Sequence, residues 1–151
     1  MTETVKDHLA FAKATYNQCW DLLDKDSLTG TDEIELLTAA FTSRYHWYAV
    51  GDERQRIISD WMVSRAAATV GDGPLAVRFA QLADGARYGS DQPAWLHASV
   101  LEGLARAYAA NGDSVQRNQY VALAEAELAK EQDPEDAAVI AAQLATVPSV
   151  G

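Results

Sequence analysis

The sequence predicts an all-α fold of about seven antiparallel helices in stacked helical hairpins. Alanine, the best helix former, is abundant. β-branched residues do not alternate with polar ones as they do in a half-buried strand. Gly-Asp recurs at 51, 71 and 112, each time between two segments of helical periodicity. Glycine suits the residue that closes a helix and aspartate the one that caps the next, and short connections force antiparallel neighbours.

The first two helices are predicted from apolar residues that recur every three or four positions. The first covers 5–23, and a polar loop over 24–31 follows it. The second should begin at Asp32, which stands three residues before Glu35 in the spacing of a capping box. It should end at Gly51, for which we expect the left-handed backbone conformation.

Capping signals delimit the other five helices. The fourth helix should be short, over 74–88. The starts of the five are marked by an aspartate cap or by a proline in the first turn, at Asp52, Asp72, Pro93, Asp113 and Asp133.

Length and composition favour one domain with a proper core. The chain has 151 residues, of which 48% are hydrophobic, so we predict a single domain over 1–147 and a flexible tail over 148–151. The lone Cys19 excludes an internal disulfide and fits a reducing compartment. We find neither a signal peptide nor a run of about 20 apolar residues that could span a membrane, and therefore expect a cytoplasmic protein.

The net charge of −10 argues against two classes of partner. Most of such a surface would repel a phosphate backbone or an anionic membrane, so we expect neither nucleic-acid nor membrane binding. Three scattered histidines and one cysteine have no metal-ligand spacing, and no glycine-rich phosphate loop occurs. We therefore predict no metal and no cofactor.

One stretch resembles the tetratricopeptide family. Leu101-Glu102-Gly103-Leu104-Ala105-Arg106-Ala107-Tyr108, Gly112-Asp113, Tyr120 and Ala124 fall at the family's spacing, whereas Arg117 replaces the usual alanine. Weaker copies surround Gly71-Asp72 and Gly51-Asp52. The chain also resembles an uncharacterised bacterial group of small helical-repeat proteins, through segments that include Ser43-Arg44-Tyr45-His46-Trp47 and Trp61-Met62-Val63-Ser64-Arg65. That second resemblance implies no activity.

The tetratricopeptide resemblance implies a ligand-binding face on the first helix of each hairpin. The two better copies are those around Gly112-Asp113 and Gly71-Asp72. In them this face carries, above all, Trp61 with Arg65 and Glu102 with Arg106. Each pair is four residues apart and so lies on one side of its helix. Two arginines beside a tryptophan could hold the carboxylate of a peptide. Alternatively, Glu102 only pairs with Arg106, and Arg65 pairs with Asp60.

A second cluster of polar and aromatic residues is formed by Arg44, His46 and Trp47. His46 could act as a general base with Asp60 orienting it, or it could be a packed histidine at a helix contact. The leading hypothesis is a protein- or peptide-binding adaptor with a concave groove and no catalytic residue. The alternatives are a small-molecule site or enzyme around His46, Asp60 and Arg65, and a structural homodimer with no ligand.

Overall fold

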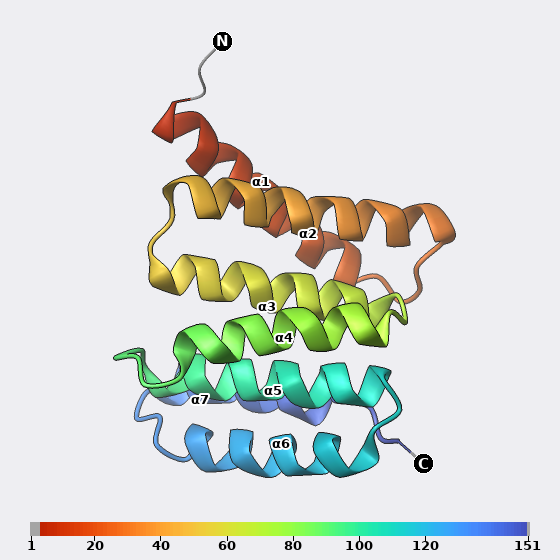
Figure 1. Cartoon of the computed structure of the whole chain (residues 1–151), viewed down its shortest axis with the longest axis vertical. Helices are drawn as coiled ribbons and strands as arrows, with labels where there is room; N and C mark the ends of the chain where they lie inside the picture. The colour runs from red at the N-terminus through yellow and green to blue at the C-terminus, as the bar shows by residue number, and fades with distance from the viewer. Residues whose placement is uncertain (1–3, 151) are drawn as a thin grey trace.

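The computed structural model describes residues 4–150 and confirms the prediction of an all-α chain with seven helices. No strand occurs between residues 4 and 150. The helices stack from α1 and α2 at one end to α6 and α7 at the other (Figure 1). Their bounds are α1 (Val5–Leu23), α2 (Gly30–Val50), α3 (Glu53–Thr69), α4 (Gly73–Arg87), α5 (Ala94–Ala110), α6 (Ser114–Leu128) and α7 (Pro134–Ala145).

The helices form two layers. The most extensive contacts join α1 to α2, α3 to α4 and α5 to α6, so each pair is a hairpin. The odd-numbered helices also contact each other in sequence, α1 with α3, α3 with α5 and α5 with α7, and they form one layer. The even-numbered helices form the other layer. In Figure 1, α1 passes behind α2 and α7 lies behind α5.

Most predicted helix starts agree with the structure. Asp52, Asp72, Asp113 and Asp133 each accept a backbone N–H of the first turn of their helix. The predicted start of α2 is wrong, because Thr29 is its cap and Asp32, the third residue of the helix, completes that capping box. Both Thr29-Asp32 and Asp32-Glu35 have the spacing of a capping box. The cap at Thr29 makes α2 longer and so gives it more backbone hydrogen bonds.

The glycines that end the helices use two conformations. Gly71 and Gly112 have φ of 86° and 75°, the left-handed values expected of a closing glycine. The prediction of that conformation for Gly51 is wrong, because its backbone is extended, with φ −79° and ψ 161°. Glycine is required there for a different reason: a Cβ atom would lie 2.5 Å from the Trp47 carbonyl oxygen.

The core is built largely from alanine, which lets the helices approach closely. Ala66 and Ala67 of α3, Ala76 of α4 and Ala105 of α5 are fully buried. Arg117, the residue that departs from the repeat pattern, donates to the carbonyls of Val147 at 2.9 Å and Pro148 at 3.0 Å. Gly151 lies outside the described residues, and the flexible tail over 148–151 stays a prediction.

Candidate binding site

A fully buried carboxylate lies at the centre of the odd-helix layer. Glu102 of α5 has no solvent exposure. Its Oε1 atom accepts a hydrogen bond from Arg106 Nε at 2.8 Å and forms an ion pair with Arg106 Nη2 at 2.7 Å, and its Oε2 atom accepts a hydrogen bond from Trp61 Nε1 at 3.2 Å. Arg65 Nη1 lies 3.6 Å from Oε1. The register of the hairpins therefore brings together all four residues of the predicted groove.

Arg106 is used within the fold. Its Nη2 atom also donates to the Gln143 carbonyl at 3.0 Å and to Thr146 Oγ1 at 2.8 Å. These acceptors lie at the C-terminal end of α7, where helix carbonyls lack partners in the helix and a positive charge is favourable. Arg106 therefore fastens α7 to α5, and the structural pairing with Glu102 considered above is present.

Arg65 is less completely paired. Its Nη1 atom is buried and has no hydrogen-bond partner among residues 4–150. Burial, followed by the charge of Arg106, lowers the pKa of Arg65. The alternative pairing of Arg65 with Asp60 is absent, because Asp60 faces other partners.

Asp60 is buried and belongs to a separate cluster between α2 and α3, in which its partners are partly exposed. Its side chain accepts hydrogen bonds from Arg44 Nε at 2.6 Å and from the Tyr48 hydroxyl at 2.5 Å. The Arg44 guanidinium also lies 4.1 Å from the centroid of the Tyr48 ring. Burial and the bond to Asp60 raise the pKa of Tyr48. The cluster joins two helices and leaves neither oxygen of Asp60 without a partner.

His46 and Trp47 point to other parts of the molecule. His46 is nearly buried, and its Nδ1 atom lies 2.9 Å from the Nδ1 atom of His8 in α1. Trp47 lines a shallow depression with Tyr16 and Ile58. The residues predicted around His46 therefore do not converge on one site: His46 contacts α1, whereas Arg44 contacts Asp60.

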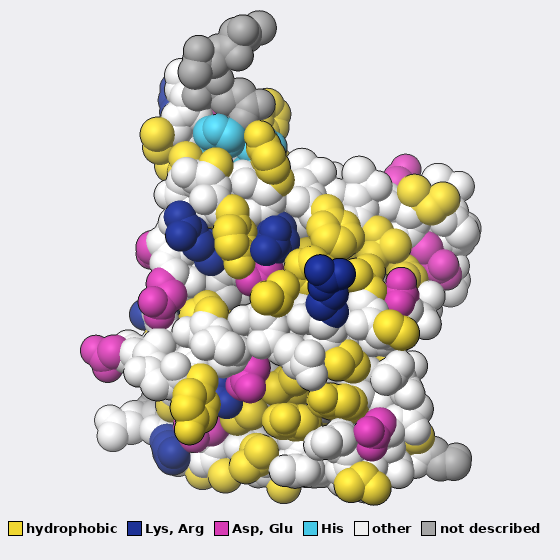
Figure 2. Space-filling model, in the orientation of Figure 1, with side chains coloured by type: hydrophobic (Ala, Val, Ile, Leu, Met, Phe, Trp, Pro, Cys, Tyr) yellow, Lys and Arg dark blue, Asp and Glu magenta, His cyan; other side chains and the backbone are white. Residues whose placement is uncertain are grey.

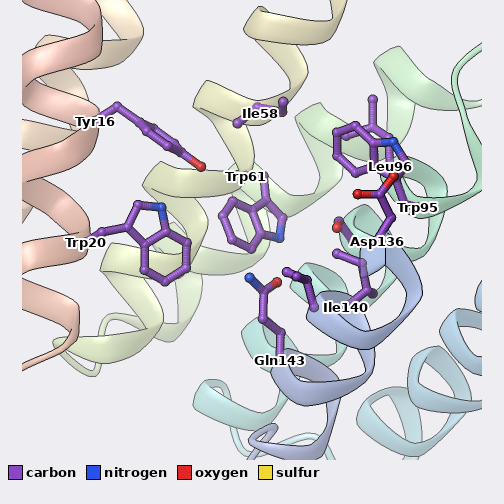
Figure 3. A pocket seen from close by; sticks show the side chains of 11 residues that line it. Tyr16, Trp20, Ile58, Trp61, Trp95, Leu96, Asp136, Ile140 and Gln143 are labelled. Atoms are coloured by element: carbon purple, nitrogen blue, oxygen red, sulfur yellow. The ribbon is translucent and has the colours of Figure 1, made fainter. Parts of the chain in front are cut away.

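One of the cavities of the odd-helix layer is an aromatic pocket of about 260 Å³. In Figure 3, Tyr16 and Trp20 of α1 approach Trp61 of α3 from one side, and side chains of α7 approach it from the other. We call this cavity the aromatic pocket; it is lined by Tyr16, Trp20, Ile58, Trp61, Trp95, Leu96, Ser99, Asp136, Val139, Ile140 and Gln143. Val139 is 56% exposed, so the α7 side opens to solvent.

The pocket and the buried network share a wall. Trp61 lines the pocket with its ring and donates from Nε1 to Glu102. Gly103 makes this position possible, because a Cβ atom there would lie 2.8 Å from Trp61 Cδ1. On the opposite wall, Trp20 lies with its ring centroid 6.0 Å from that of Trp61. Burial raises the pKa of Tyr16, which keeps its hydroxyl protonated.

Sequence reasoning predicted Trp61 on this face but missed the other aromatic walls. The repeat-like segments lie around Gly51-Asp52, Gly71-Asp72 and Gly112-Asp113, and they include neither α1 nor α7. Tyr16 and Trp20 are four residues apart in α1, the same spacing as Trp61 and Arg65 in α3. Extending the register to the first hairpin would have placed both residues on the inner face.

Other kinds of site have little support in the part of the chain that is described. The pKa of Cys19 is raised to about 12 by burial, so its thiol is a poor nucleophile. Residues 4–150 contain no group of three or more histidine, cysteine, aspartate or glutamate side chains that could hold a metal ion. None of the helices described combines the length and apolar character needed to cross a membrane.

No protein-family model, no curated protein and no solved structure matches the chain.

Proposed function

We propose that the protein is a binding adaptor that holds a peptide or protein segment against its odd-helix layer, with one side chain of that segment in the aromatic pocket. The observation that carries this proposal is the size and lining of the pocket. Pockets for drug-sized ligands and cofactors have volumes of about 300–1,000 Å³. A volume of about 260 Å³ suits one large side chain better. Interfaces between proteins are commonly dominated by a few such buried anchors.

The arrangement of the helices gives further support. Tetratricopeptide arrays bind ligands on the first helices of their hairpins, and the pocket is lined from the helices in the corresponding positions, α1, α3 and α5. This support is an analogy of architecture, and membership of that family is part of the proposal. We also propose that the protein is cytoplasmic. We expect no nucleic-acid partner, since the net charge of the chain is −10.

The proposal differs from the sequence hypothesis in the role of the arginines. Arg106 and Glu102 bind each other, so an alanine variant of Arg106 would disturb the fold as well as any ligand. The pocket wall is a better place for the test. We propose that the ligand contacts Trp61, Trp95 and Val139, while the network behind Trp61 holds that wall in place.

The test uses peptides selected from a random library on the immobilised protein. Val139→Phe should fill the pocket mouth and weaken binding of the selected peptides at least about tenfold, or 1.4 kcal/mol. Val115→Phe is the matched control, because Val115 is 75% exposed on α6 and outside the pocket. Equal binding by Val139→Phe and the wild type, with unchanged melting temperatures, would refute the proposal.

The alternative of a small-molecule site or enzyme at His46, Asp60 and Arg65 has no comparable support. The three side chains interact with three different groups: His8, the Arg44–Tyr48 pair and Glu102.

Association of two copies also stays a prediction. Figure 2 shows hydrophobic side chains gathered in the region of α2 on the face nearest the viewer. Ile34, Phe41 and Tyr45 of α2 are exposed. Light scattering at two protein concentrations should give a higher mass at the higher concentration if two copies meet there. A constant monomer mass would exclude it.

A further inference from the structure

An unpaired carboxylate lines the aromatic pocket. Asp136 is an exposed residue in the first turn of α7, and no cationic side chain among residues 4–150 forms an ion pair with it. Desolvation, followed by the charges of Asp133 and Glu131, raises the pKa of Asp136. Glu131 itself accepts a hydrogen bond from the backbone N–H of Trp95 at 2.9 Å. The α7 side of the pocket is therefore negatively charged, and its charge is not balanced locally.

The remaining lining suits an apolar stem that ends in a positive charge. Tyr16, Trp20, Trp61 and Trp95 present aromatic rings to the cavity, and Ile58, Leu96 and Ile140 present aliphatic groups. The face of an aromatic ring attracts a cation, most strongly where water is excluded. Lysine and arginine combine a cationic end with a long apolar stem that can be buried.

Two arginines lie near these rings, and neither lines the cavity. Arg65 is 5.6 Å from the centroid of Trp20, but its charge faces Glu102. Arg54 is exposed, lies 5.9 Å from the centroid of Trp95 and donates to Gln92. Of the charged groups around the pocket, Asp136 is the one that lines the cavity itself. An incoming cation would therefore meet a carboxylate there.

We propose that the side chain held in the aromatic pocket is basic, with its stem along the aromatic and aliphatic walls and its charge toward Asp136. This inference rests on the proposed function and names the chemistry of its partner: a peptide or protein segment with an exposed lysine or arginine. The net charge of −10 would attract such a segment and speed its association. An acidic segment would meet repulsion at Asp136 instead.

The test compares two small probes of the same stem. N-acetyl-lysine amide and N-acetyl-norleucine amide differ by the terminal ammonium group. Titration of ¹⁵N-labelled protein, followed through the indole N–H signals of Trp61 and Trp95, should give a Kd at least about tenfold lower for the lysine probe, or 1.4 kcal/mol. Peptides selected from the random library should share a lysine or arginine at one position.

Two conservative variants locate the charge that is responsible. Asp136→Asn should raise the Kd of the lysine probe to that of the norleucine probe, and should leave the norleucine probe unchanged. Glu135→Gln is the matched control, since Glu135 precedes Asp136 in the first turn of α7 and does not line the pocket. It should keep at least about half of the fold preference for the lysine probe. Both carboxylates are exposed, but only that of Asp136 lines the cavity, so more solvent screens the charge of Glu135 from a bound ammonium group.

The outcomes separate this inference from the proposed function. If norleucine binds as tightly as lysine, the pocket takes an apolar side chain; the inference fails and peptide binding stands. The inference also fails if selected peptides bind in the pocket without a basic residue, or if neither probe shifts the indole signals at concentrations on the order of 10 mM. If no peptide binds in a manner sensitive to Val139→Phe, both proposals fail together.

Discussion

Replacing Arg106 by methionine should lower the free energy of unfolding by about 3–5 kcal/mol. The change removes the hydrogen bond and the ion pair that Arg106 makes with Glu102 and leaves that carboxylate buried, with Trp61 Nε1 as its remaining donor and Arg65 at 3.6 Å. Methionine keeps most of the apolar stem, so little packing is lost. Because domains are stable by only about 5–15 kcal/mol, the expected loss is a large part of the total.

Urea unfolding followed by far-UV circular dichroism measures this loss. Arg117→Met is the matched control: Arg117 also bonds to the C-terminal segment, at Val147 and Pro148, but has no buried acid as partner. We expect the control to cost about 1 kcal/mol or less. The double variant Glu102→Gln/Arg106→Met should cost less than the sum of its single variants, with a coupling energy of about 1–3 kcal/mol.

Two results would refute this reasoning about the buried network. A loss for Arg106→Met no larger than that for Arg117→Met would mean that Glu102 does not depend on its arginine. Additive losses in the double-variant cycle would mean that Glu102 and Arg106 do not interact in solution. In either case the argument that Arg106 fastens α7 to α5 through Glu102 would fail.

Two further predictions follow from the glycines and the helix caps. Gly103→Ala should lower the free energy of unfolding by about 1–3 kcal/mol, because the added Cβ crowds Trp61. Gly85→Ala has nothing within 4 Å of its added Cβ and should stabilise α4 by about 0.5–1 kcal/mol. Melting temperatures that shift in the same direction for both variants would contradict this. The hydrogen bond from the Thr29 backbone lowers the pKa of Asp32 below its ordinary value of 3.8. The ionised Asp32 therefore stabilises the fold above pH 3.8, and this stabilisation is lost as the pH falls through the lowered pKa. The difference in urea midpoint between wild type and Asp32→Asn should therefore shrink toward about pH 2, and an unchanged difference would contradict the cap argument.

The helices were predictable because their start and stop signals are local. Asp52, Asp72 and Asp113 cap their helices by accepting the backbone N–H three residues further on, which depends little on the rest of the fold. The start of α2 was misplaced because two overlapping segments, Thr29–Asp32 and Asp32–Glu35, satisfy the same pattern. The sequence does not say which of two such caps the folded chain will use.

The site was only partly predictable because its walls come from distant helices. The proximity of Trp61 and Glu102 follows from the hairpin register, since α3 and α5 occupy equivalent positions. The partners of Asp60 do not follow from it: Arg44 and Tyr48 reach Asp60 from α2 because of the way two helix surfaces interlock. The periodicity of α7 likewise predicts a buried side, with Ile140 and Leu144, but not the helix that covers it.

The docking of α7 determines what the odd-helix layer can bind. Arg106 binds the end of α7, and side chains of α7 line the aromatic pocket together with those of α1, α3 and α5. The two sequence-level alternatives, structural ion pairs or a binding site, are therefore not exclusive. The ion pairs hold Trp61 and α7, and both line the cavity in which we propose that a ligand side chain is held.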